Sequence, residues 1–98
     1  MAEQRVFIND EAANADISRL REAILKLDES LNTVSRLRQT ASGMQGQTGA
    51  AIVEQSVKLE TQINSLKGNL NRTIKSIQNA ISEYHEKDAE LAHAISQY

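Results

Sequence analysis

The sequence predicts an all-α fold, an antiparallel hairpin of two helices in which the second helix is the longer one. Proline is absent and only four glycines occur among 98 residues, so few positions disfavour helix formation. Three of the four glycines fall within residues 41–50, which indicates a single reversal of the chain. On both sides of that segment, apolar residues recur every three or four positions, the period of one face of a helix.

The first helix is predicted over about residues 10–42. Asn9 or Asp10 is suited to cap its first turn, and the carboxylate of Glu11 would interact favourably with the positive end of the helix dipole. The apolar face is carried by residues at alternating steps of four and three, namely Ala13, Ile17, Leu20, Ile24, Leu27, Leu31 and Val34.

The turn is predicted over about residues 43–48 and the second helix over about residues 49–95, within a single domain that spans residues 1–98. We expect Gly43 to adopt a left-handed conformation after the first helix and Thr48 to cap the second. Gly68 lies inside the second helix and is expected to be a tolerated surface glycine. The apolar face of this helix comprises Ile52, Ser56, Leu59, Ile63, Leu66, Leu70, Ile74, Ile77, Ile81 and Tyr84.

Composition and charge argue against several function classes. The chain has 11 basic and 13 acidic residues with a formal net charge of −2, and no basic run, so nucleic acid is not an expected partner. Cysteine is absent, which removes disulfides and thiolate metal sites. Apolar runs are far shorter than the ~20 residues of a membrane span, and the start MAEQRVFIND has no apolar core of a secretory signal peptide. We therefore expect neither membrane insertion nor Sec-type export.

The second helix is predicted to extend past the start of the first. Folding back at the turn places residue 82 opposite residue 10, which leaves about 16 residues, or ~24 Å of helix, without an intramolecular neighbour. The apolar face continues there through Tyr84, Asp88, Leu91, Ile95 and Tyr98. A two-helix core is thin, and the hairpin is expected to need another helical surface. The predicted partner-binding stripe comprises Ile17, Leu20, Ile24, Leu27, Leu31, Leu59, Ile63, Leu66, Leu70, Ile77, Ile81, Leu91 and Ile95.

The segment YHEKD contains Tyr84 and Asp88 one helical turn apart, so both side chains lie on one face. With this motif after a helical hairpin of this length, the chain resembles the WXG-type substrates of type VII secretion, in which Tyr-x-x-x-Asp/Glu is an export signal. It departs from them at the turn, which reads SGMQG, and it has no tryptophan. In this respect it is more similar to the small companion proteins of LXG toxins.

That resemblance implies a function in binding. Such a companion would bind the helical N-terminal domain of an LXG-type toxin, with or without a second small helical companion. It would present Tyr84 and Asp88 to the secretion ATPase. The resemblance further implies a cytoplasmic location before export and secretion without a cleaved signal peptide.

No cofactor, metal or enzymatic activity is expected. Glu86, Glu90 and His93 share a helical face in a Glu-x-x-His pattern, but a di-metal site needs a second such motif on a facing helix. We interpret these side chains as solvated charges. The sequence has no nucleophile elbow, phosphate-binding loop or acid pair in a plausible cleft.

Two alternatives stay open at the sequence level. One is a cytoplasmic structural coiled-coil adaptor without an export function, which would apply if SGMQGQTG does not turn. The other is a WXG-type homodimer that is itself secreted.

Overall fold

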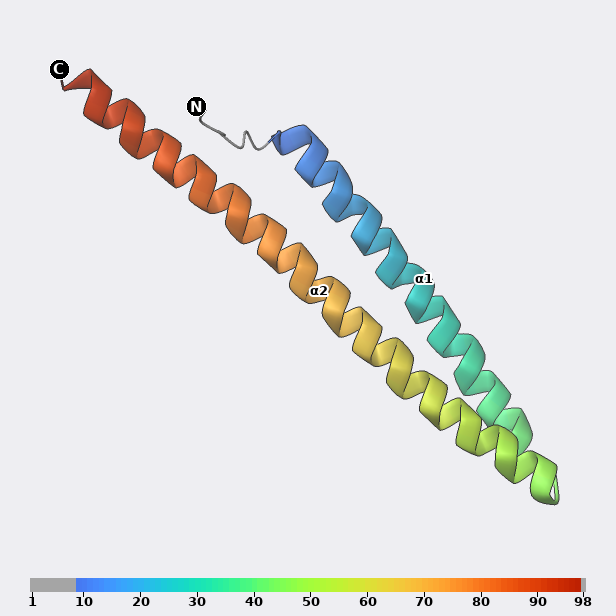
Figure 1. Cartoon of the computed structure of the whole chain (residues 1–98). Coiled ribbons are helices and arrows are strands. Elements are labelled where there is room, and N and C mark those ends of the chain that lie inside the picture. The colour runs from blue at the N-terminus through green and yellow to red at the C-terminus, as the bar shows by residue number, and fades with distance from the viewer. Residues whose placement is uncertain (1–8, 98) are drawn as a thin grey trace, which may run out of the picture.

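The computed structural model describes residues 9–97 of the chain. Two helices, α1 (Asp10–Ser42) and α2 (Gln47–Ser96), run antiparallel in a rod 79 Å long (Figure 1). The predicted all-α hairpin with a longer second helix is therefore confirmed. Tyr98, which the sequence places on the apolar face, lies outside the described residues.

The first turn of α1 is capped as the sequence predicts. The Asn9 side chain accepts a hydrogen bond of 3.1 Å from the backbone N–H of Ala12. The Asn9 carbonyl also accepts from the N–H of Ala13 at 2.9 Å. Asp10 and Glu11 follow in the first turn, where their negative charge is favourable against the helix dipole.

At the turn, the positive-φ glycine and the residue that precedes α2 are not the ones that the sequence predicts. Gly43 has φ −85° and completes a helical turn by donating from its N–H to the Thr40 carbonyl at 3.1 Å, so the expected left-handed Gly43 was wrong. Gly46, at φ 94°, has the positive φ instead. Gly46 also precedes α2, so Thr48 lies inside the helix and does not cap it.

Gly49 allows the two helices to approach closely just after the turn. A β-carbon at this position would lie 2.7 Å from the Met44 carbonyl oxygen and 3.0 Å from that of Ala41. Real β-carbons essentially never come as close as 2.7 Å to another heavy atom, so only glycine fits without a shift of the backbone. Gly49 and Ala41 are both buried, and Ala41 is 2 % exposed.

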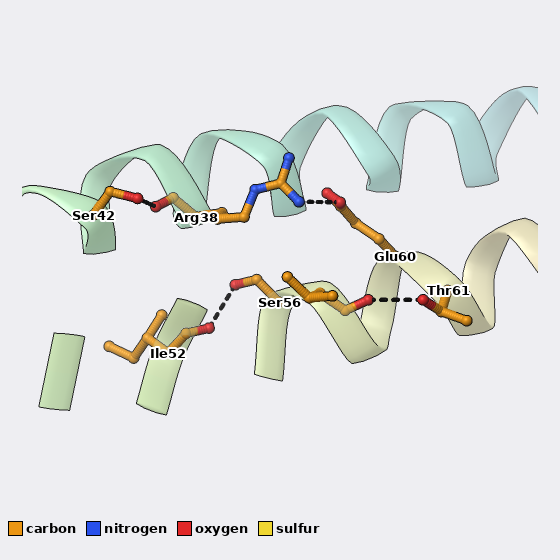
Figure 2. Close-up of polar contacts among 7 residues, drawn as sticks. Arg38, Ser42, Ile52, Ser56, Glu60 and Thr61 are labelled. Atoms are coloured by element: carbon orange, nitrogen blue, oxygen red, sulfur yellow. Dashed lines mark hydrogen bonds and ion pairs between the residues drawn. The ribbon is translucent and has the colours of Figure 1, made fainter. Parts of the chain in front are cut away.

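The core is a thin aliphatic seam between the helices. Its buried large side chains are Ile17 and Val34 from α1 with Ile63 and Ile74 from α2. The polar exception is Ser56, whose hydroxyl donates to the Ile52 carbonyl at 2.7 Å and is thereby satisfied within α2 (Figure 2).

Three pairs of charged or titratable side chains connect the helices along their length. Arg38 pairs with Glu60 near the turn (Figure 2), and Asp28 pairs with Lys67 in the middle. His85 Nε2 lies 2.7 Å from Asp10 Oδ2 at the start of α1. These pairs show the antiparallel register over the whole of α1.

Side-chain pairing between the helices reaches His85, whereas the sequence places residue 82 opposite residue 10. This difference is expected because helical side chains lean toward the N-terminus of their own helix and reach past their backbone level. The unpaired part comprises residues 86–96, about 16 Å of helix. We call residues 86–96 the overhang.

Candidate protein-binding surface

Tyr84 lies at the junction between the paired part of α2 and the overhang. Its ring is half-buried and packs edge-on against the His85 ring, with centroids 5.8 Å apart and planes at 74°. Asp88 follows one turn later and is exposed. The predicted pair is therefore placed on one continuous helix, with the aromatic ring partly anchored and the carboxylate in solvent.

All residues of the overhang are exposed, including two large aliphatic side chains. Leu91 is 46 % and Ile95 is 63 % exposed. Side chains of this kind are usually buried against another element when they repeat at helical spacing. Within the described residues, nothing on this chain covers them.

The hairpin has two long sides, and all three cross-helix pairs lie on one of them. Asp10 and Asp28 are eighteen residues apart, as are Lys67 and His85, and eighteen residues correspond to about five full turns. Each helix therefore points these side chains in the same direction. Glu60, the partner of Arg38, lies seven residues before Lys67, about two turns, and so points to the same side of α2. The side that these pairs close is called the ion-paired side.

The opposite side is hollowed, and its part near the turn is mainly apolar. A groove of about 530 Å³ lies there, lined by Leu37 of α1 and by neutral residues of α2 that include Thr48, Ala51, Ile52 and Leu59. A second groove, lined by Lys26, Glu29, Ser30, Thr33 and Val34 of α1, shares Leu59 with the first. This second groove continues along the same side of the hairpin.

Large apolar residues follow this hollowed side along the whole of α2. Leu59 and Leu66 are 43 % and 47 % exposed, although they belong to the apolar period of the helix. The same edge of α2 leads to Tyr84 and into the overhang. We call this surface the open face and define it by Leu37, Ile52, Leu59, Leu66, Ile77, Tyr84, Leu91 and Ile95.

The structure divides the predicted partner-binding stripe into three sets. Ile17 and Ile63 are buried in the hairpin's own seam, so they are engaged within the chain. A further seven are half-buried between the helices and partly accessible from outside: Leu20, Ile24, Leu27, Leu31, Leu70, Ile77 and Ile81. The remaining four are exposed on the open face: Leu59, Leu66, Leu91 and Ile95.

Sequence reasoning missed Leu37 as a surface residue. Leu37 lines the groove at the turn end and is 49 % exposed. It lies three residues after the seam residue Val34, so a wider apolar stripe would have included it.

Glu86, Glu90 and His93 are exposed on the overhang. Among residues 9–97, no group of three or more His, Asp or Glu side chains is placed to hold a metal ion. Across the part of the chain that the structure describes, neither helix is apolar over a length sufficient to cross a membrane.

Comparisons with protein-family models, with curated protein sequences and with solved structures found no match to this chain.

Proposed function

We propose that this chain is a non-enzymatic targeting companion of type VII secretion. In this proposal it binds the helical N-terminal domain of an LXG-type toxin and presents Tyr84 and Asp88 as an export signal. A second small helical companion would complete the assembly where the toxin requires one.

The observation that carries the proposal is the overhang. The α2 helix continues through residues 86–96 after His85, which pairs with Asp10 of α1, and it still bears Leu91 and Ile95 on the open face. An exposed helix with an apolar face is the form in which helical partners are recognised. Tyr84 and Asp88 occupy the point where this helix leaves the hairpin.

The open face and the Tyr84–Asp88 pair would bind different partners, because their chemistry differs. The open face offers leucine and isoleucine side chains, which gain free energy when a helix covers them. Tyr84 and Asp88 offer an aromatic anchor and a charge one turn apart, which suits recognition by a groove on the secretion ATPase. Binding is the proposed activity because these surfaces consist mainly of apolar side chains.

A secretion assay tests the export function. Asp88→Ala is expected to abolish secretion of the chain and its toxin while the hairpin unfolds at the same denaturant concentration, because Asp88 is exposed and pairs with no described residue. Glu86→Ala is the matched control, since Glu86 is an equally exposed acid in the same overhang. Tyr84→Leu keeps apolar packing at the junction but removes the ring, and it is also expected to abolish secretion.

Unchanged secretion of both the Asp88 and the Tyr84 variants would contradict the export function. That result would leave the chain a binding function without an export signal. Loss of secretion in the Glu86 control as well would show that any change in the overhang is harmful, and the two-residue signal would be rejected.

A further inference from the structure

We propose that the segment directly before α1, Val6 to Ile8, docks on the overhang of the same chain and covers Leu91 and Ile95. This docking goes beyond the proposed function, because it requires neither a toxin nor a secretion system. The segment lies outside the described residues, so its site is inferred from where α1 begins, from the apolar side chains and from the charges of the two parts.

The chain enters α1 beside the base of the overhang. Asp10 is the first residue of α1, and its Oδ2 atom lies 2.7 Å from Nε2 of His85. The overhang begins at the residue after His85, and Figure 1 shows α2 continuing beyond the start of α1. The residues before Asn9 are therefore attached next to the part of α2 that α1 leaves uncovered.

The segment and the apolar part of the overhang match in length. Val6 lies four residues before Asp10, and an extended chain of four residues spans at most ~14 Å. Leu91 and Ile95 lie six and ten residues after His85, which is about 9 Å and 15 Å along the helix. Side chains of the segment can therefore reach both residues from the start of α1.

The cap of α1 directs this segment toward α2. Asn9 is the N-cap residue and its backbone is extended, with φ −84° and ψ 105°. An apolar residue directly before an N-cap often packs against the fourth residue of the helix, which pairs Ile8 with Ala13. Ala13 is half-buried and belongs to the apolar period of α1 that faces α2. This contact would turn the chain before Asn9 toward the overhang.

The overhang is the uncovered apolar surface nearest to the segment. Leu91 and Ile95 are 46 % and 63 % exposed, and the other exposed large apolar side chains of the described residues lie between positions 25 and 66. Leu25 is fifteen residues after Asp10, about 22 Å along α1. Apolar side chains gain free energy when they cover one another, and only the overhang is within reach of the segment.

The charges of the two parts are complementary. Arg5 directly precedes the apolar segment, and it is the only basic residue among residues 1–8. Residues 86–90 carry three acids and one lysine, a net charge of −2, and all are exposed: Glu86, Lys87, Asp88 and Glu90. Attraction between Arg5 and this acidic part would favour docking over the ~10 Å range of electrostatic interaction in dilute salt.

Docking of the segment has a consequence for recognition. Asp88, Leu91 and Ile95 follow one another at steps of three and four residues, so they share one face of the overhang. A segment that covers the two apolar side chains also lies beside the Asp88 carboxylate. A helical partner that binds this face must therefore displace the segment, which acts as an autoinhibitory cover.

Fluorine NMR of Phe7 tests the docking, because Phe7 is the chain's only phenylalanine. Incorporation of fluorophenylalanine gives one resonance, which is expected to be displaced from that of a free peptide of residues 1–9. The double variant Leu91→Ser with Ile95→Ser is expected to move it to the free-peptide position.

Leu59→Ser with Leu66→Ser is the matched control and is expected to leave the resonance unchanged. These two leucines are exposed on the same open face but lie at least nineteen residues before His85. A wild-type resonance at the free-peptide position, or equal effects of the two double variants, would overturn the proposal. A resonance that changes on dilution would also overturn it, because the segment would then dock on another molecule.

Cysteine cross-linking tests which side of the overhang the segment covers, and the chain has no cysteine of its own. Gln4→Cys is combined either with Ala92→Cys or with Glu90→Cys, and both overhang positions are exposed. Ala92 lies seven residues after His85, which places it on the side of α2 that faces α1, whereas Glu90 points the opposite way.

A disulfide within one chain is expected to form several-fold faster with Ala92→Cys than with Glu90→Cys. Equal rates would show a segment that reaches both sides freely, and docking would be rejected. Neither the fluorine nor the cross-linking measurement uses a toxin, so both can fail while the proposed export function holds. The secretion assay can likewise fail while the docking holds.

Discussion

Gly49 and Gly68 both lie in α2, but an added methyl group would have different surroundings at each position. At Gly49 it would overlap the Met44 carbonyl oxygen, at 2.7 Å. At Gly68 the nearest atom is Arg72 Nη1 at 3.8 Å, which belongs to the end of a flexible side chain. The first glycine is required by the turn, and the second is tolerated.

Alanine substitutions at these two glycines should have opposite effects. Gly49→Ala is expected to lower the free energy of unfolding by about 1–3 kcal/mol, because the tip must shift to admit the methyl group. Gly68→Ala is expected to raise it by about 0.5–1 kcal/mol, since alanine favours the helical conformation. Urea denaturation followed by circular dichroism, at one fixed protein concentration, measures both. A stabilised Gly49→Ala variant would contradict the close approach at the turn.

The conformation of individual residues at the turn was the part of the fold that was hardest to predict from the sequence. Glycine-rich composition located the reversal, but three glycines in ten residues do not reveal which one takes positive φ. That depends on where α1 ends, and α1 uses Gly43 to complete its last turn. Thr48 was predicted as a cap because its side chain suits that position, whereas the backbone at Gly46 ends the turn two residues earlier.

At the level of the helices, apolar period and capping chemistry predicted the elements well. The observed α1 (Asp10–Ser42) has the expected bounds, and α2 (Gln47–Ser96) begins two residues before its expected start. The period of three and four residues also placed Ile17, Ile63 and Ile74 on the seam. These features are local, so a single sequence contains the information that specifies them.

The apolar period did not predict which side of the hairpin is closed by cross-helix pairs and which side is open. A stripe of apolar residues identifies the face toward the other helix but does not reveal which edge remains uncovered. The distinction depends on long side chains that cross between helices, such as Lys67 toward Asp28. Leu59 and Leu66 therefore appeared equivalent to Ile63 in the sequence, and they are exposed in the structure.

A charge exchange between the helices tests the register at this scale. Asp28→Lys places two ammonium groups side by side, and it is expected to lower the free energy of unfolding by about 0.5–1 kcal/mol. Combining it with Lys67→Asp should recover most of that loss, because opposite charges again face each other. Thermal or urea unfolding of the single and double variants measures the coupling. Additive losses would contradict the pairing.

The whole molecule is a rod with one side closed by cross-helix pairs and one side left open. One side is closed by Arg38–Glu60, Asp28–Lys67 and Asp10–His85, and the other presents the open face from the turn-end groove to the overhang. Small two-helix units bury little apolar surface, so covering this face adds stability as well as specificity.

Capture of a helical partner by matched variants tests whether the open face is the binding surface. The chain is co-expressed with the helical N-terminal domain of an LXG-type toxin, and the amount of toxin domain that co-purifies is measured. We expect the wild-type chain to retain the toxin domain and Leu66→Glu to lose it. Val57→Glu is the control and should retain it, because Val57 is as exposed as Leu66 but lies nine residues away, on the opposite side of α2. Equal retention by Leu66→Glu and Val57→Glu, or no retention by the wild-type chain, would contradict the account.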